Sequence, residues 1–166
     1  MKAHAKKNIR ELENEFYDSH VSYSIIALAN LISLNTMKNT LDGTQLTVNE
    51  WRVLRLAFIY GSICAADVIN LFGLDKTTTG RAISRLKNAG LVKLSVDSSD
   101  KRRTNVTLTA AGTRLHHQVI KRDSVSDDSI EQILTEAELR SFHRAMKKLR
   151  LHVKDMLNLS TQAGDT

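Results

Sequence analysis

The chain has 166 residues, of which 42% are hydrophobic and 25% are charged, a composition typical of one soluble globular domain or of two halves that share a core. This composition excludes a collagen-like or wholly disordered chain. The sequence contains no run of 18 apolar residues, so we expect no membrane span. The single cysteine excludes an internal disulfide, so we expect a reducing, cytoplasmic location. Proline is absent, which favours long helices.

The positive charge is concentrated in one segment. Lys and Arg number 24 against 18 Asp and Glu, a net charge of +6, and the segment from residue 76 to residue 103 holds eight cations but only two acids. The rest of the chain is neutral. One basic segment on a neutral body is typical of a nucleic-acid-binding protein, and a solvated basic face is the alternative.

Residues 11–38 are expected to form one long helix. Its apolar positions begin at Leu12 and Phe16 and widen into a broad surface from Tyr23 to Met37. A helix that is apolar on more than one face is buried on more than one side. We expect the segment 41–43, which contains Gly43, to end it.

Two shorter helices follow. Thr47 and Glu50 form a capping-box pattern that opens a helix to about Tyr60, with Trp51 on its apolar face. Gly61 closes that helix, and Ser62 is expected to cap the next one, which ends at Gly73.

The fourth helix has a buried face and a basic face. Asp75 caps it, and it runs from Lys76 to about Ala89. Its inner stripe recurs at helical spacing, whereas Arg81 and Arg85 lie on the opposite face. Two helices joined by a tight turn, the second with a basic outer face, have helix-turn-helix spacing.

A β-hairpin follows the basic helix. Apolar and polar residues alternate over 92–96 and again over 105–108. The loop between them, residues 97–103, is long and ends in three cations. Reversing the chain does not require such a loop, whereas a wing lying on DNA does.

Two further helices complete the chain. Thr109 caps the first, which we interpret as continuous across residues 123–129, and Thr135 with Glu138 forms a capping box that opens the second. The last helix has a seam of apolar residues at spacings of 3 and 4, which predicts packing against another helix. A second subunit is one candidate for the origin of that partner helix. The seam residues are Leu139, Phe142, Met146, Leu149, Val153 and Met156.

Three stretches of the sequence carry a family resemblance: residues 46–54, residues 74–86 with 89–92, and Asp100–Arg103 followed by Leu108-Thr109 and Ala111-Gly112. Together they resemble the MarR family of winged helix-turn-helix regulators. The resemblance implies a mainly α fold with a small β-hairpin wing, in which residues 46–108 bind DNA. It also implies that residues 1–45 and 109–166, with Phe16 and the seam, dimerise on a near-palindromic operator.

The same resemblance assigns the DNA contacts. Asp100 would hold the wing and orient Arg102, which would enter the minor groove, where negative potential is concentrated. Arg81 and Arg85 would contact either guanine or phosphate. The expected contacts are Lys76, Thr77, Thr78, Arg81, Arg85, Asp100, Lys101, Arg102 and Arg103. Gly80 departs from the usual Ser, which either allows close approach to DNA or removes one contact.

A small-molecule effector is a further implication of the resemblance. Many similar proteins release DNA when a phenolic or carboxylate compound binds between the dimer helices and the winged domain. The expected residues are His20, Tyr23, Trp51, Arg55, Tyr60 and His116. Core packing is the simpler role for Trp51, and a salt bridge is the alternative for Arg55.

Other readings have less support in the sequence. Cys64 stands among apolar residues, as a small buried side chain does, although a redox role is the alternative. The six histidines show no metal-ligand spacing, and we expect neither a metal nor a cofactor. There is no phosphate loop or nucleophile motif, so we expect no enzyme. The leading hypothesis is that the protein is a repressor, which a small-molecule effector releases from its operator. The alternative is a non-specific architectural DNA-binding protein without an effector.

Overall fold

The computed structural model describes residues 8–9, 13, 16–17 and 19–157, without the side chains of residues 126 and 127. The described part of the chain forms two compact units, and the boundary between them follows Asp123. The first unit contains six helical segments and a β-hairpin, and the second contains the end of one helix and a whole further helix.

The predicted first helix is interrupted. Helix α2 spans Val21–Asn35 and continues as the π-helical segment η1, Thr36–Thr40, but His20 before it has an extended backbone (φ −140°, ψ 92°). The Ser24 hydroxyl donates to the carbonyl oxygens of Tyr17 (2.7 Å) and His20 (3.1 Å). The same two carbonyl oxygens also accept backbone N–H groups, that of His20 at Tyr17 (3.4 Å) and that of Ser24 at His20 (3.1 Å). The single helix over 11–38 was therefore wrong at His20, and its residue Leu12 lies outside the described residues.

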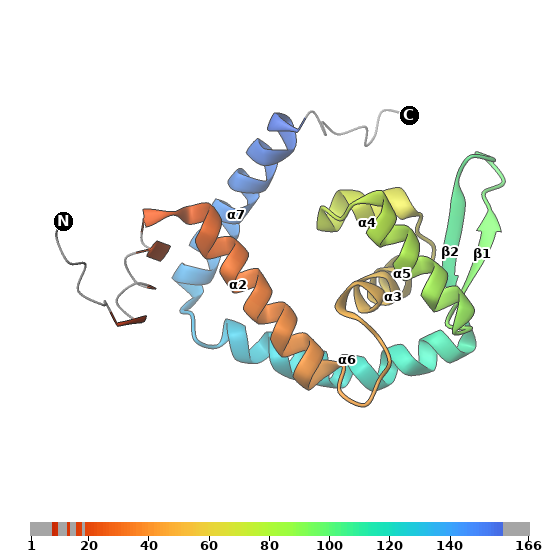
Figure 1. The fold of residues 1–166 in the computed structure, drawn as a ribbon, viewed down its shortest axis with the longest axis horizontal. Helices are drawn as coiled ribbons and strands as arrows, with labels where there is room; N and C mark the ends of the chain where they lie inside the picture. Colours follow the sequence, from red (N-terminus) through yellow and green to blue (C-terminus); the bar gives the residue numbers. More distant parts are fainter. Residues whose placement is uncertain (1–7, 10–12, 14–15, 18, 158–166) are drawn as a thin grey trace, which may run out of the picture. The chain divides into compact units, whose positions relative to one another are not determined.

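Three helices and a hairpin surround the core of the first unit. They are α3 (Val48–Tyr60), α4 (Ala65–Phe72), α5 (Lys76–Asn88), β1 (Val92–Val96) and β2 (Thr104–Leu108). Figure 1 shows these helices gathered beside the hairpin. The centre is apolar because each of these elements turns its hydrophobic face inward, and α6 (Ala110–Glu131) adds Val119. The other residues there include Leu54, Val68, Ile83, Leu86 and Val106.

The sheet is larger than the sequence pattern predicts. The two strands pair antiparallel, with Val92 opposite Leu108 and Val96 opposite Thr104. Ile63 adds an isolated bridge to Val106, with N–H to O=C distances of 3.1 and 2.7 Å. Because Ile63 pairs with Val106 and Cys64 has an extended backbone (φ −122°, ψ 172°), α4 begins at Ala65. Its cap is therefore Cys64 with Asp67 and not the expected Ser62.

The last two helices begin where the sequence predicts. Helix α6 runs without a break over Ala110–Glu131, and α7 over Glu136–Met156 begins with the capping box of Thr135 and Glu138. A Cβ on Gly112 would lie 2.0 Å from the Leu91 carbonyl oxygen. Glycine at this position thus allows α6 to approach the segment that joins α5 to β1.

None of the helices in the described part of the chain combines the length and the apolar character needed to cross a membrane.

Candidate nucleic-acid interface

Helix α5 is held from one side and open on the other. Asp75 accepts a hydrogen bond from the Thr78 N–H (2.8 Å), which fixes where the helix begins. Thr79, Ala82, Ile83 and Leu86 are buried against the core. Lys76, Thr77, Arg81 and Arg85 are exposed. Burial of an apolar stripe thus presents the expected basic face to solvent.

Thr78 differs from the other expected contacts on α5. Its hydroxyl donates to the second carboxylate oxygen of Asp75 at 2.6 Å, and the side chain is half-buried. These hydrogen bonds to Thr78 hold the pKa of Asp75 below its ordinary value. The Thr78 hydroxyl proton is therefore used inside the helix cap, which leaves the oxygen and the methyl group for any external contact.

The wing loop is organised around Asp97. Its carboxylate accepts from the backbone N–H of Ser99 (2.8 Å) and of Asp100 (3.2 Å), from the Ser99 hydroxyl (2.5 Å), and from the Asn105 amide (2.8 Å). The hydrogen bonds from Ser99 and Asn105 hold the pKa of Asp97 far below its ordinary value. One side chain thus fixes the path of the chain at the start of the loop.

Asp100 acts on the backbone of the wing. Its side-chain oxygen accepts from the Arg102 N–H at 2.9 Å, and its carbonyl accepts from the Arg103 N–H at 2.9 Å. Asp100 was expected to hold the wing and orient Arg102, and these bonds hold the loop backbone at that residue. Asp100 orients Arg102 through the main chain, and the Arg102 side chain is exposed.

Arg103 joins the wing to α4. Its guanidinium donates to the Asp67 carboxylate at 3.1 Å, and both side chains are about half exposed. The same carboxylate accepts from the Cys64 N–H at the start of α4 (2.6 Å). Arg103 therefore has an intramolecular partner as well as the phosphate contact assigned to it from the sequence.

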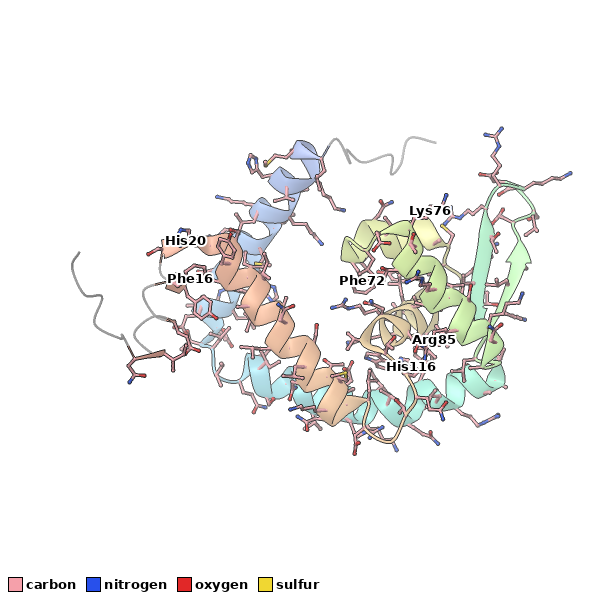
Figure 2. The ribbon with its side chains drawn as sticks, viewed as in Figure 1. Phe16, His20, Phe72, Lys76, Arg85 and His116 are labelled. Atoms are coloured by element: carbon pink, nitrogen blue, oxygen red, sulfur yellow. The ribbon has the colours of Figure 1, made fainter. Side chains whose placement is uncertain are left out.

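Arg85 pairs with a buried carboxylate. Its Nε lies 2.7 Å from Glu50 Oε1, and the Glu50 side chain is 4% exposed. Glu50 Oε2 accepts from the Thr47 N–H at 2.8 Å, so both oxygens are occupied. This pair connects the start of α3 to the C-terminal half of the basic helix. Figure 2 shows Arg85 on that part of α5.

Three of the expected effector residues form one cluster. His116 on α6 is 2% exposed and stacks on Phe58 (centroids 3.8 Å apart) and on Trp51 (5.3 Å). Neither ring nitrogen has a hydrogen-bond partner among the described residues. Burial lowers the pKa of His116, and the charges of His117 and Arg55 lower it further. Arg55 pairs with Asp123, as the salt-bridge alternative predicted.

The other three expected effector residues lie outside this cluster in the described part of the chain. His20 and Tyr23 pack on each other and on Phe16, with centroids 5.1 to 5.8 Å apart. Tyr60 ends α3 and is 67% exposed. The expected effector residues therefore fall into the cluster around His116, the pair of His20 and Tyr23, and Tyr60 by itself.

The dimerisation residues are open to solvent within the chain itself. No residue of α7 is buried, and Leu139 and Met146 are the half-buried members of the seam. The exposed members are Phe142, Leu149, Val153 and Met156. Phe16 and much of α2, including Leu31 at 63% exposure, are exposed as well.

Four polar residues that position the interface were missed from the sequence. Glu50 was recognised only as a cap, whereas Asp67, Asp97 and Asn105 were not assigned. The Asp97-Ser98-Ser99 run is a usual side-chain turn pattern, and it was the one available signal. Cys64 is buried and free, and no group of three metal-ligating side chains exists among the described residues.

These elements define a winged helix-turn-helix DNA-binding domain. The chain matches the family model of the winged helix DNA-binding domain over residues 46–112. It is similar to the HTH-type transcriptional regulator FarR of Neisseria gonorrhoeae, with 26% identity over 71% of this chain and 80% of FarR. The chain thus contains a winged helix DNA-binding domain and is similar to transcriptional regulators that carry one.

Two solved structures extend the comparison to most of the chain. The MarR/EmrR family regulator of Acinetobacter sp. ADP1 has a TM-score of 0.73 at 24% identity, over 84% of this chain and 98% of that one. The second structure is that of BpsR of Bordetella bronchiseptica, whose DNA binding is regulated by 6-hydroxynicotinic acid. Its TM-score is 0.66 at 24% identity, over 78% of this chain and 98% of BpsR. The fold is that of the MarR family, and the resemblance in the sequence is confirmed.

Proposed function

We propose that this chain is a dimeric repressor that binds a near-palindromic operator and is released by a small phenolic or carboxylate effector. The observation that carries the DNA-binding part is the basic outer face of α5 followed by a wing whose tip is fixed by Asp97 and Asp100. Lys76, Thr77 and Arg81 would lie in the major groove, and Arg102 would enter the minor groove.

The exposed apolar seam supports the dimer. Four of its six residues are exposed on a helix without a buried residue, and a second copy would remove that surface from water. Residues up to 45 and from 109 onward would form the dimerisation region. Two α5 helices about one DNA turn apart, roughly 34 Å, would then contact both half-sites.

The cluster of Trp51, Arg55 and His116 supports an effector site. A buried imidazole without a hydrogen-bond partner is costly, and a ligand hydroxyl or carboxylate would supply one. BpsR, with the same fold, is regulated by 6-hydroxynicotinic acid. An effector that prefers a different spacing of the wings would weaken DNA binding by its differential affinity for the two states.

The test is a fluorescence anisotropy titration of DNA from the upstream intergenic region and of scrambled DNA, at two salt concentrations. We expect tight, salt-sensitive binding to the upstream DNA and weaker binding to the scrambled one. Arg102→Ala should weaken specific binding by about 1–3 kcal/mol. Arg114→Ala on α6, which removes an exposed cation outside the basic segment, should leave affinity nearly unchanged.

A non-specific architectural protein is the alternative that this test separates. It would bind both DNAs with the same affinity and the same salt slope. A specificity ratio near one would therefore overturn the repressor proposal.

A further inference from the structure

Helix α7 carries a second concentration of positive charge, far along the chain from α5 and the wing. Residues 140–154 contain six Lys and Arg and no Asp or Glu, the same excess of +6 as the basic segment of residues 76–103. The acids that balance this stretch precede it, because residues 123–138 contain six Asp and Glu and no Lys or Arg. The six cations are Arg140, Arg144, Lys147, Lys148, Arg150 and Lys154.

Four of these cations lie on the side of α7 opposite its apolar seam. The seam residues fall at the first and fourth positions of a seven-residue repeat, which are the positions that face a partner helix. At 3.6 residues per turn, the centre of the four cations lies roughly 180° around the helix from the centre of the seam. We call them the back face, and all four are exposed: Arg140, Arg144, Lys147 and Lys148.

The charge of the back face is largely uncompensated within the described part of the chain. Its one ion pair there joins Arg140 to Glu136 at 3.1 Å, between two exposed side chains. Arg144 donates to the hydroxyl of Ser141 at 3.3 Å, which leaves its charge unpaired in that description. Like charges three and four positions apart destabilise a helix, and Arg144 has every other member of the face at such a spacing. An anionic partner would relieve this repulsion.

We propose that the back face of α7 binds the phosphates of duplex DNA independently of sequence, as a second DNA contact besides α5 and the wing. Four cations without an acid match a polyanion. They extend over roughly 12 Å of helix axis, a length along which a DNA duplex carries about seven negative charges. Contacts of Lys and Arg to phosphate hold the duplex and carry no direct sequence information.

The residue types on the back face favour a duplex over other anionic partners. Single-stranded nucleic acid is bound by aromatic side chains on which bases stack, whereas Phe142, the one Phe, Tyr or Trp of α7, lies in the seam. An anionic membrane takes up the apolar side of an amphipathic helix, which would turn the back face away from the lipid. Leu151 lies among the cations and is 49% exposed, so it can be used to test for an apolar partner.

This second contact goes beyond the proposed operator binding and does not depend on it. Helix α7 belongs to the second compact unit, whereas α5 and the wing belong to the first. A second copy packed on the seam, as the proposed dimer requires, would leave the back face of each copy in solvent. A dimer bound to its operator would therefore keep two basic surfaces for further DNA.

The test is the salt dependence of binding to a fluorescent duplex of scrambled sequence, measured by anisotropy with the full chain. The slope of log K against log salt concentration counts neutralised phosphates, at about 0.9 for each. Arg144→Gln combined with Lys147→Gln should reduce this slope by about 2 and weaken binding severalfold at low salt. Lys38→Gln combined with Arg114→Gln removes two exposed cations elsewhere and, as the matched control, should change neither quantity.

Three further measurements separate the site from a general effect on the fold. The double variant on α7 loses like-charge repulsion, so its melting temperature should equal or exceed that of the wild type. Leu151→Ala should leave DNA binding unchanged. The scrambled duplex should shift the amide NMR signals of residues 140–151, and it should still do so when Arg81→Ala and Arg102→Ala weaken the contacts of α5 and the wing.

Three results would overturn the second contact. Equal salt slopes in the α7 double variant and its matched control would mean that the back face neutralises no phosphate. Weaker binding in Leu151→Ala would indicate an apolar partner. Binding to phosphatidylserine vesicles that is tighter than binding to the duplex, and is lost in the double variant, would assign the face to a membrane.

Failure of the proposed operator binding gives a different result. Upstream and scrambled DNA would then bind with equal affinity, while the difference in salt slope between the α7 double variant and its control would remain.

Discussion

Helix α5 and the wing loop are placed by different forces. The helix is held by apolar burial, with Thr79, Ala82, Ile83 and Leu86 in the core. The loop contains no buried residue between positions 97 and 103 and is held by hydrogen bonds that the carboxylates of Asp97 and Asp100 accept. Apolar burial is insensitive to pH and screening, whereas bonds to ionised carboxylates depend on their charge. The position of α5 is therefore expected to be insensitive to pH and salt, whereas the conformation of the wing loop is expected to depend on them.

The largest effect should come from the buried side of α5. Leu86 is 1% exposed, and Leu86→Ala should lower the free energy of unfolding by about 2–5 kcal/mol, because it removes packed methyl groups and leaves a cavity. Chemical denaturation followed by circular dichroism measures this change. Leu71→Ala, at a leucine 46% exposed, is the matched control and should cost much less. Equal effects of the two variants would contradict the account of how α5 is held.

A substitution in the wing loop should change the affinity for DNA and leave the stability of the fold nearly unchanged. Asp97→Ala removes the acceptor of four hydrogen bonds and should weaken operator binding severalfold, while the melting temperature changes little. Asp97→Asn keeps one acceptor oxygen, so its affinity for the operator should lie between those of Asp97→Ala and the wild type. An unchanged affinity in Asp97→Ala would mean that the loop needs no fixed path.

The same carboxylate gives the wing a pH dependence. Because hydrogen bonding lowers the pKa of Asp97, its contribution is complete above the ordinary value of about 4 and is lost as the pH falls below it. NMR shifts of the Ser99 and Asn105 amides should therefore remain constant from pH 7 to pH 4. Titration of these shifts near pH 4 or above would contradict the assignment.

His116 should make the core sensitive to mild acid. Its folded pKa is lowered by burial, so the unfolded chain binds the proton more readily and stability falls as the pH decreases below about 6.5. One group can contribute at most about 1.4 kcal/mol per pH unit. His116→Phe keeps the aromatic stack and should flatten the dependence between pH 7 and pH 5.5. An unchanged slope in that variant would assign the effect to other histidines, for which His143→Gln is the control.

The smallest effect should come from Gly80 on α5. A Cβ at this position would meet nothing within 4 Å, so Gly80→Ala should stabilise the helix by about 1 kcal/mol. Its DNA affinity decides between the two interpretations of this glycine. Weaker operator binding would indicate close approach of the helix to DNA, and unchanged binding would indicate a missing contact.

The sequence predicts the elements that depend on periodic burial. The capping boxes at Thr47 and Thr135, the basic helix after Asp75 and the two strands all lie where local pattern places them. These signals are local, because a helix or strand repeats its inward face every few residues. The continuity of α6 across residues 123–129 was also predicted correctly.

What the sequence did not predict depends on partners far along the chain. Arg85 and Glu50 are 35 positions apart, Arg103 and Asp67 are 36 apart, and the Ile63–Val106 bridge spans more than 40. Such pairs have no period, and polar residues at surface spacing look the same whether or not they have a partner. The separation of the expected effector residues into the cluster around His116, the pair of His20 and Tyr23, and Tyr60 has the same origin.

The most direct test of DNA binding through α5 and the wing is a hydroxyl-radical and methylation footprint on the upstream DNA with wild type and Arg102→Ala. We predict two major-groove protections about one turn apart, flanked by minor-groove protections that only the wild type produces. An identical footprint for both proteins, or no positioned protection at all, would contradict this account.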